Sequence, residues 1–332
     1  MKVPKFLVTT PLPSPGMEIL ARAGEVVSPP TPPSPEELRE SCASGRIDVL
    51  VSQLSDRLDS ELLSVARISG ISTYAVGVNN IDVETATSRA IMVANTPGIL
   101  TNATADLALL LILGTARRIV EADKYVRGGE FDGWKPDLLL GQDVSGMTLG
   151  LAGFGRIARA VARRALAFDM TVIACRRPPK NLVVTEAELG EFLGKVEFVE
   201  WHELLERSDF VSLHVPLTTD TRHLIDTTAL GMMKESAILI NTARGPVVDE
   251  EALVESLRTG GIFAAGLDVY ENEPALAPGL AELTNSVLLP HLGSATASVR
   301  AEMARTCAEN AVAMANGDLP SFPVNPSAWA RA

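Results

Sequence analysis

Three segments near the C-terminal end of the chain contain side chains suited to acid–base chemistry. Arg244 lies in INTARGPVVD, Glu273 in GLDVYENEP and His291 in LPHLGS. Imidazole can donate a proton near neutral pH, a neighbouring carboxylate favours the protonated ring, and a guanidinium binds a carboxylate in bidentate fashion. The chemistry open to these residues is proton transfer beside a bound anion.

Each of these residues also has a simpler interpretation. A lone histidine after a strand can be structural, a glutamate before proline can be solvated, and Arg244 can form a loop-end ion pair. However, the three segments end or follow the last three expected strands, so their side chains should gather at the carboxyl edge of one sheet, where ligands bind in such folds. This joint placement favours a site. No comparable set of motifs accompanies the other histidines, which are His202, His214 and His223.

A glycine-rich turn stands earlier in the chain, in TLGLAGFGRIA at 148–158. An apolar strand precedes the turn and an amphipathic helix follows it, as the dinucleotide-binding fingerprint requires. Gly153 would permit the tight turn, Gly155 would let the backbone approach a pyrophosphate, and the small Ala158 would allow close packing of helix and strand. The alternative is a purely structural turn.

The end of the next strand indicates which dinucleotide would bind. In this fold an acidic residue about 20 positions beyond the glycines binds the ribose hydroxyls of NAD. Here the strand TVIAC is followed by Arg176 and Arg177 instead. Guanidinium groups can bind a 2′-phosphate, so the sequence predicts a preference for NADP(H), with NAD(H) possible. The alternative is a pair of solvated surface arginines.

Short β-branched runs alternate with helix-length segments along most of the chain, which predicts an α/β fold with parallel sheets. Strands are expected in the first third at 6–10, 48–53, 71–76 and 91–94. A second series of six is expected at 148–152, 170–175, 210–215, 237–241, 264–269 and 287–289. Dense apolar residues from Thr104 to Val126 predict one long helix buried on most sides, and a last helix should end at Ala315.

Composition excludes several classes of protein. The formal net charge of −12 argues against a nucleic-acid partner. Cys42, Cys175 and Cys307 fit neither a disulfide framework nor a metal cluster, and no metal motif accompanies the histidines. Prolines interrupt the N-terminus, and the apolar run 107–113 is too short to span a bilayer. We therefore expect a cytoplasmic protein with no metal and no membrane partner.

The three C-terminal segments resemble the signature motifs of the D-isomer-specific 2-hydroxyacid dehydrogenase family. The resemblance covers nearly the whole chain and includes Val76-Gly77 with Asn80-Ile81-Asp82. Within the family, LTNATAD at 100–106 and Gly133-Trp134-Lys135-Pro136 are most similar to glyoxylate/hydroxypyruvate reductases. The resemblance implies two doubly wound parallel-sheet domains. A Rossmann-type nucleotide domain, residues 101–297, would be inserted in a flavodoxin-like substrate domain, residues 1–100 plus 298–332.

The resemblance also implies a reaction, the reduction of small 2-oxo acids such as glyoxylate or hydroxypyruvate to D-2-hydroxy acids. His291 would be the general acid, which agrees with the chemistry of imidazole. Glu273 would fix the ring and favour its protonated form, and Arg244 would bind the substrate carboxylate and polarise the carbonyl.

Further substrate and cofactor contacts are implied by the same resemblance. The amides of Val76 and Gly77 would complete the carboxylate site, and Trp134 would reach the substrate pocket of the partner in a homodimer. His214 would form part of the cofactor wall. The residues expected to contact the cofactor are Thr104, Gly153, Phe154, Gly155, Arg156, Ile157, Arg176, Arg177, Val215, Pro216, Thr221, Thr242, Ala243, Asp268 and Gly293.

Two alternatives stay open. One is a sibling dehydrogenase of the D-lactate, phosphoglycerate or phosphonate type; no C-terminal regulatory domain is expected, which weakens the phosphoglycerate interpretation. The other is a non-catalytic nucleotide-sensing scaffold, against which the set Arg244, Glu273 and His291 argues. The stretch 181–195 is assigned only to a helix and loop near the adenosine end of the cofactor.

Overall fold

The computed structural model describes residues 3–175, 190 and 194–331. The chain forms two compact units, residues 1–100 with 294–332 and residues 101–293. Each unit has its own parallel β-sheet, and the described strands number five in the first unit and seven in the second. These two sheets confirm the predicted α/β fold class.

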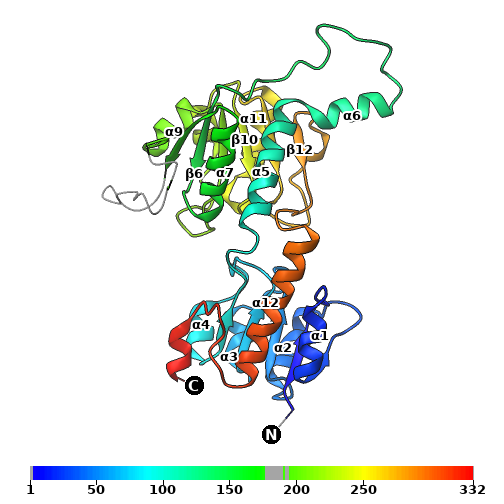
Figure 1. Cartoon of the computed structure of the whole chain (residues 1–332), viewed down its shortest axis with the longest axis vertical. Helices are drawn as coiled ribbons and strands as arrows, with labels where there is room; N and C mark the ends of the chain where they lie inside the picture. The colour runs from blue at the N-terminus through cyan, green and yellow to red at the C-terminus, as the bar shows by residue number, and fades with distance from the viewer. Residues whose placement is uncertain (1–2, 176–189, 191–193, 332) are drawn as a thin grey trace. The chain divides into compact units, whose positions relative to one another are not determined.

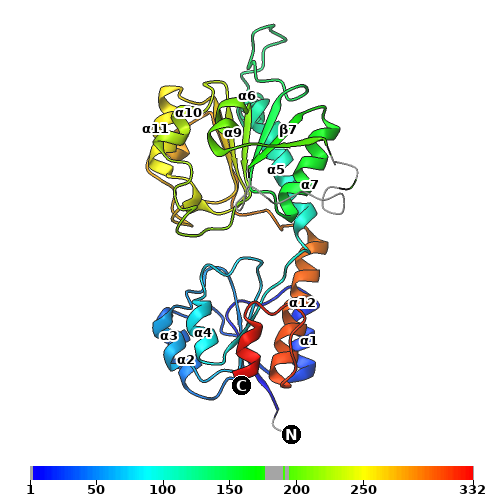
Figure 2. The same ribbon diagram turned by 90° about the vertical axis from the view of Figure 1, so that its left-hand side faces the viewer.

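In the first unit the strand order is β2-β1-β3-β4-β5, the flavodoxin-like order. Apolar residues of β1, β3 and β5 pack on one face with α1 and α12, and α2, α3 and α4 cover the other face (Figures 1 and 2). The elements of this unit are β1 (Lys5–Val8), α1 (Gly16–Ala23), β2 (Glu25–Val27), α2 (Pro35–Ala43), β3 (Val49–Ser52), α3 (Ser60–Val65), β4 (Gly70–Thr73), α4 (Val83–Ser88), β5 (Met92–Ala94) and α12 (Ala297–Ala315).

In the second unit the strand order is β12-β11-β10-β9-β6-β7-β8. The order reverses between β6 and β9, so a Rossmann-type switch point lies at their carboxyl ends. Helices α5 and α7 cover one face, and α9, α10 and α11 cover the other (Figure 2). The elements are α5 (Thr101–Ala116), α6 (Ile119–Arg127), β6 (Thr148–Ala152), α7 (Arg156–Ala167), β7 (Thr171–Cys175), β8 (Val196–Phe198), α9 (Trp201–Arg207), β9 (Phe210–Leu213), α10 (Thr227–Met232), β10 (Ile238–Asn241), α11 (Glu250–Thr259), β11 (Ala264–Leu267) and β12 (Ser286–Leu288).

The prediction of one buried helix from Thr104 to Val126 was wrong. Helix α5 ends at Ala116, and Arg118 adopts a left-handed backbone with φ of 51°, which a continuous helix cannot contain. The following helix, α6, has no buried residue. In Figure 1, α6 and the segment after it extend away from the sheet of the same unit.

Two edge strands were not predicted. Strand β2 has no buried residue, and only Val196 is buried in β8. Neither strand therefore has the apolar pattern that marks a central parallel strand. No helix within the described residues is both long and apolar enough to cross a membrane.

Candidate active site

The glycine turn lies at the switch point of the second sheet. Gly153 follows β6 with a φ of +94°, a left-handed conformation that glycine adopts without strain. A Cβ atom at Gly153 would lie 2.8 Å from the carbonyl oxygen of His214, at the end of β9. The Gly153 amide donates to the carbonyl of Cys175 at 2.7 Å, so the turn is tied to the end of β7 as well.

The space beside this turn fits a dinucleotide. Gly155 is the N-cap of α7, and a Cβ atom there would meet nothing within 4 Å. The free amides of the first helical turn, beginning at Arg156 and Ile157, suit a pyrophosphate. Ala158 is fully buried, as close packing requires. The ring of Phe154 packs edge-on against the ring of Phe198, with 5.1 Å between the ring centroids.

A second group of predicted cofactor residues meets at the carboxyl ends of β10 and β11. Asp268 is buried and accepts the amides of Leu292 at 2.6 Å and Gly293 at 2.8 Å. The Thr104 hydroxyl donates to the Gly293 carbonyl at 3.0 Å. Burial raises the pKa of Asp268, although the two amide hydrogen bonds and the charge of His291 oppose the increase.

Thr242 and Ala243 follow β10 directly. The hydroxyl of Thr242 is buried and has no hydrogen-bond partner within the described part of the chain. A buried polar atom without a partner is costly, so a ligand atom that bonds to it would be favoured. This orphaned hydroxyl is the second observation that fits a nicotinamide dinucleotide here.

The segment after β9 borders the same turn. A Cβ atom at Gly153 would lie 3.2 Å from Val215, and the Thr221 hydroxyl donates to the Pro216 carbonyl at 2.6 Å. Burial lowers the pKa of His214 to about 4, and its Nε2 lies 2.9 Å from the Ser212 hydroxyl. A ring that is neutral at pH 7 suits the predicted wall better than an acid.

The structure brings the side chains of His291 and Glu273 together. Nδ1 of His291 lies 3.0 Å from Oε2 of Glu273, and both side chains are partly exposed. The other oxygen of Glu273 accepts the Tyr270 amide at 3.0 Å. Burial raises the pKa of Glu273, but the hydrogen bonds and the charges of His291 and Arg244 outweigh it and lower the pKa below its ordinary value. Glu273 is therefore charged at neutral pH.

The charge of Arg244 interacts with that of Glu273. Burial lowers the pKa of Arg244, and the charge of Glu273 raises it in part. Nη1 of Arg244 donates to the Ala243 carbonyl at 2.6 Å, and the Asn241 side chain donates to the Arg244 carbonyl at 3.0 Å. A desolvated guanidinium held in this way can bind a carboxylate more strongly than one in water.

Backbone geometry brings the three segments together. His291 has a φ of 55°, and its amide donates to the Asp268 carbonyl at 2.9 Å. Gly245 is packed so closely against the backbone of Tyr270 that a Cβ atom there would overlap it. The arginine segment and the glutamate segment are thus in direct backbone contact.

Val76 and Gly77 follow β4 in the first unit, at the carboxyl edge of that sheet. The Val76 carbonyl accepts the Asn95 side chain at 2.7 Å, which orients this segment. Trp134 is 84% exposed on the segment after α6 and does not join the acid–base group. Arg176 and Arg177 lie outside the described residues.

Two residues that support the site, Tyr270 and Glu250, were not predicted from the sequence. Tyr270 donates its amide to Glu273 and its hydroxyl to the Leu289 carbonyl at 2.9 Å, thereby linking two of the segments. Its place inside GLDVYENEP was the available signal. Glu250 is buried beneath the glutamate segment, and no sequence feature distinguishes it from its exposed neighbour Glu251.

Comparison with known proteins agrees with this geometry. Residues 109–293 match the family model of the D-isomer specific 2-hydroxyacid dehydrogenase NAD binding domain. A glyoxylate reductase of Thermococcus litoralis is 46% identical over 333 residues, covering 97% of each chain. A crystal structure of a Thermus thermophilus protein superposes with a TM-score of 0.86 at 43% identity, covering 96% of this chain and 99% of that one.

A third relative was solved with a cofactor. It is an NADPH-dependent glyoxylate/hydroxypyruvate reductase from Sinorhizobium meliloti, in complex with NADP and malonate. It has a TM-score of 0.85 and 29% identity, and 98% of each chain is covered. The fold, the site and these relatives define an NAD(P)-dependent oxidoreductase. The chain belongs to the D-isomer specific 2-hydroxyacid dehydrogenase family.

Proposed function

We propose that this protein is an NADPH-preferring reductase of glyoxylate and hydroxypyruvate that forms the D isomer where the product is chiral. The observation that supports it most is the His291–Glu273 pair beside Arg244, at the sheet edge that also holds the glycine turn. The glyoxylate reductase at 46% identity supports the same substrate class. The second unit is the proposed nucleotide domain and the first the proposed substrate domain.

In this proposal the nicotinamide supplies hydride to the carbonyl carbon when it is bound. Arg244 binds the substrate carboxylate and polarises the adjacent carbonyl, and the amides of Val76 and Gly77 are further carboxylate donors. His291 donates a proton to the carbonyl oxygen from Nε2, since Nδ1 faces Glu273. The charge of Glu273 favours the protonated ring, and its hydrogen bond sets the ring orientation.

The experiment that tests the function is a set of initial rates. Glyoxylate, hydroxypyruvate, pyruvate and phenylpyruvate are each assayed with NADPH and with NADH. We expect the highest kcat/KM for glyoxylate or hydroxypyruvate with NADPH. A preference for pyruvate would instead indicate a lactate-type sibling, and cofactor binding without turnover of any substrate would indicate a nucleotide-sensing scaffold.

Cofactor preference gives a sharper prediction. Cys175, the last residue of β7, accepts a hydrogen bond from the Gly153 amide, so the strand that precedes the arginine pair in the sequence ends at the glycine turn. Each charge-assisted hydrogen bond contributes about 1.5–3 kcal/mol. We therefore expect at least a tenfold higher kcat/KM with NADPH than with NADH, since 1.4 kcal/mol is about tenfold. Arg176→Asp should reverse this order.

The control for charge alone is Arg46→Asp, an exposed position in the first unit. It should leave the cofactor preference unchanged. Added salt should reduce the preference of the wild type, because it screens the attraction between a guanidinium and a phosphate. Equal use of NADH and NADPH by the wild type would show that the arginines do not select the cofactor.

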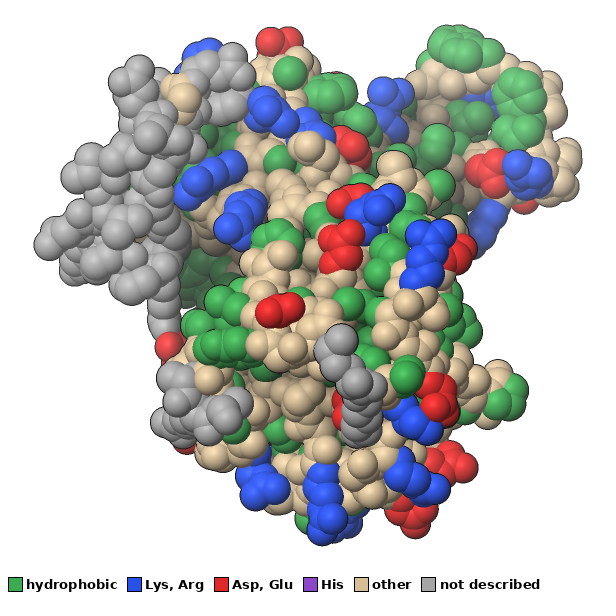
Figure 3. Space-filling model, turned by 60° about the horizontal axis from the view of Figure 1, so that its bottom comes forward, with side chains coloured by type: hydrophobic (Ala, Val, Ile, Leu, Met, Phe, Trp, Pro, Cys, Tyr) green, Lys and Arg blue, Asp and Glu red, His purple; other side chains and the backbone are tan. Residues whose placement is uncertain are grey.

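We also propose a homodimer in which Trp134 reaches the partner's substrate pocket. Large apolar side chains are exposed along α6 and the segment after it: Ile119 54%, Val126 59%, Phe131 57%, Trp134 84% and Leu140 65%. In Figure 3, α6 and the segment after it form the part that projects at the upper right, and hydrophobic side chains lie on its surface. Helix α5 begins near the carboxyl edge of the sheet, where the Thr104 hydroxyl bonds to the Gly293 carbonyl. It ends at the amino edge, where Thr115 lines a pocket with Ala264 and Ser286. Because Trp134 lies beyond α6 and is 84% exposed, we assign its contact with substrate to a second copy.

Trp134→Ala should raise the KM for glyoxylate about tenfold, the scale of a buried tryptophan anchor, and the KM for NADPH much less. Steady-state kinetics measure both constants. Sedimentation at micromolar concentration should show a dimer for the wild type. A monomer in that experiment would contradict the proposal.

A further inference from the structure

A buried carboxylate that the proposed chemistry does not use lies beneath the Glu273 segment. Glu250 is the first residue of α11 and is 3% exposed. Its Oε1 accepts the amide of Glu271 at 2.5 Å, and its Oε2 accepts the amide of Ala277 at 3.2 Å. These two amides stand on either side of Glu273 in the chain. One carboxylate therefore holds both flanks of the segment.

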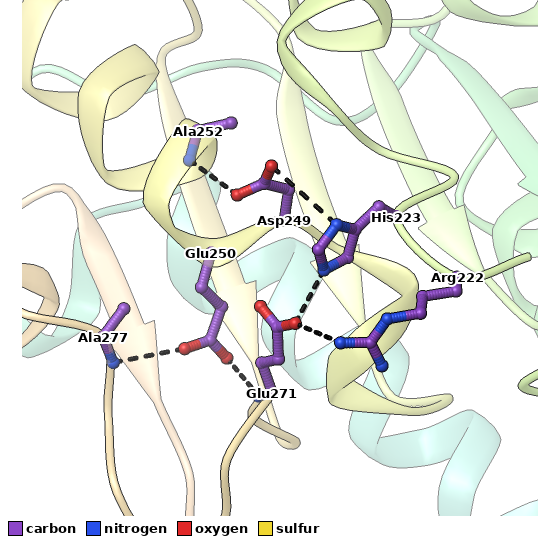
Figure 4. A network of polar contacts seen from close by, with 7 residues as sticks. All are labelled: Arg222, His223, Asp249, Glu250, Ala252, Glu271 and Ala277. Atoms are coloured by element: carbon purple, nitrogen blue, oxygen red, sulfur yellow. Dashed lines mark hydrogen bonds and ion pairs between the residues drawn. The ribbon is translucent and has the colours of Figure 1, made fainter.

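The side chain of Glu271 secures the same segment from another direction (Figure 4). Its Oε1 lies 2.6 Å from Nε2 of His223 and accepts from Nη2 of Arg222 at 3.0 Å. Nδ1 of His223 lies 3.9 Å from Asp249, whose other oxygen caps α11 through the amide of Ala252 at 3.0 Å. The network thus joins the loop after β9, the start of α11 and the glutamate segment.

The orientation of Glu273 depends on this backbone. One of its oxygens accepts the Tyr270 amide and the other faces His291, so both contacts change if the segment rotates or shifts. Burial raises the pKa of Glu250, the two amide hydrogen bonds lower it, and the charges of Glu271 and Glu273 raise it. A buried carboxylate is tolerated when its oxygens are hydrogen-bonded, and the donors here are the two amides that flank Glu273.

We propose that Glu250 and Glu271 are positioning residues for Glu273: they fix the backbone of 270–277 so that the Glu273 carboxylate meets His291. The inference rests on the proposed role of Glu273. Displacing a reacting group by about 1 Å can cost about 100-fold in rate. Loss of the Glu250 carboxylate should therefore reduce kcat while leaving the glycine turn between β6 and α7 intact.

The test compares Glu250→Gln with Glu251→Gln, the exposed neighbour on the same helix. Glutamine keeps the size of the side chain but presents an NH₂ group to one of the two amides. We expect kcat for glyoxylate with NADPH to fall at least tenfold in Glu250→Gln, with NADPH affinity within twofold of the wild type. Glu251→Gln should match the wild type in both measurements.

A double-mutant cycle separates positioning from general stability. If Glu250 acts through Glu273, Glu250→Gln should cost less than twofold in kcat when Glu273→Gln is already present. Independent, multiplicative losses would overturn the proposal. His223→Gln and Arg222→Gln, which change partly exposed side chains, should lower kcat in the same direction and also lose their effect in Glu273→Gln. These variants test the proposal even if Glu250→Gln does not fold.

Hydrogen exchange provides a readout that does not need turnover. The amides of 270–273 and 275–277 should exchange at least tenfold faster in Glu250→Gln, while those of 291–293 and of the first unit stay unchanged. Faster exchange throughout the second unit, or unchanged exchange at 270–277, would overturn the proposal. Absence of wild-type turnover would contradict the proposed function instead, and the exchange result would still show whether Glu250 holds the segment.

Discussion

His291→Ala is expected to reduce kcat for glyoxylate at least about 100-fold, the usual scale for loss of a general acid. Its imidazole Nδ1 lies 3.0 Å from the Glu273 carboxylate, which leaves Nε2 as the nitrogen available to the substrate. Steady-state rates with NADPH measure the loss. NADPH affinity should barely change, because His291 is not among the residues expected to contact the cofactor.

His202→Ala is the matched control, since it removes an exposed imidazole from α9 in the same unit. It should retain wild-type turnover. Glu273→Gln adds a pH-dependent readout. The carboxylate favours the protonated ring, so its loss should shift the alkaline decline of reduction to lower pH. Wild-type turnover by His291→Ala would contradict the proposed role of His291 as general acid.

Arg244→Gln is expected to reduce kcat/KM for glyoxylate by about 100-fold or more, the scale of losing a charged donor from a desolvated site. The guanidinium is buried enough for its pKa to be lowered, so its charge is weakly screened and its interaction with a substrate carboxylate is strong. Arg244→Lys should recover only part of the loss, because an ammonium cannot make the bidentate contact.

Arg258→Gln removes the same charge from an exposed position on α11, where the side chain is 68% exposed. Its kcat/KM should equal that of the wild type. The two arginines thus separate local binding from net charge. A similar small effect of both substitutions on kcat/KM would show that Arg244 does not bind the substrate.

Much of the fold was predictable because the signals were local and strong. The apolar runs of β6 and β9 are buried almost throughout, and the glycine turn combines a strand, Gly153 and a helix within one short stretch of chain. Right-handed crossovers restrict the possible order of the strands in a parallel sheet. The strand and turn signals do not depend on contacts distant in sequence.

The rest depended on contacts that local patterns do not encode. Ile119 and Val126 are apolar and spaced as in a buried helix, yet both are exposed because the chain turns at Arg118 and leaves the sheet. Glu250 and Glu251 are both ordinary first-turn acids in the sequence. Only the docking of residues 270–277 over one of them makes it a buried acceptor.

The left-handed backbone of His291 has a consequence for the evolution of this fold. A side chain with a Cβ atom costs about 1 kcal/mol at such a position compared with glycine, and asparagine tolerates it better than most residues. Selection for stability alone would therefore replace the imidazole. Descendants that keep the nucleotide site but lose catalysis should accumulate glycine or asparagine at this position, whereas continued histidine marks lineages in which turnover is still under selection.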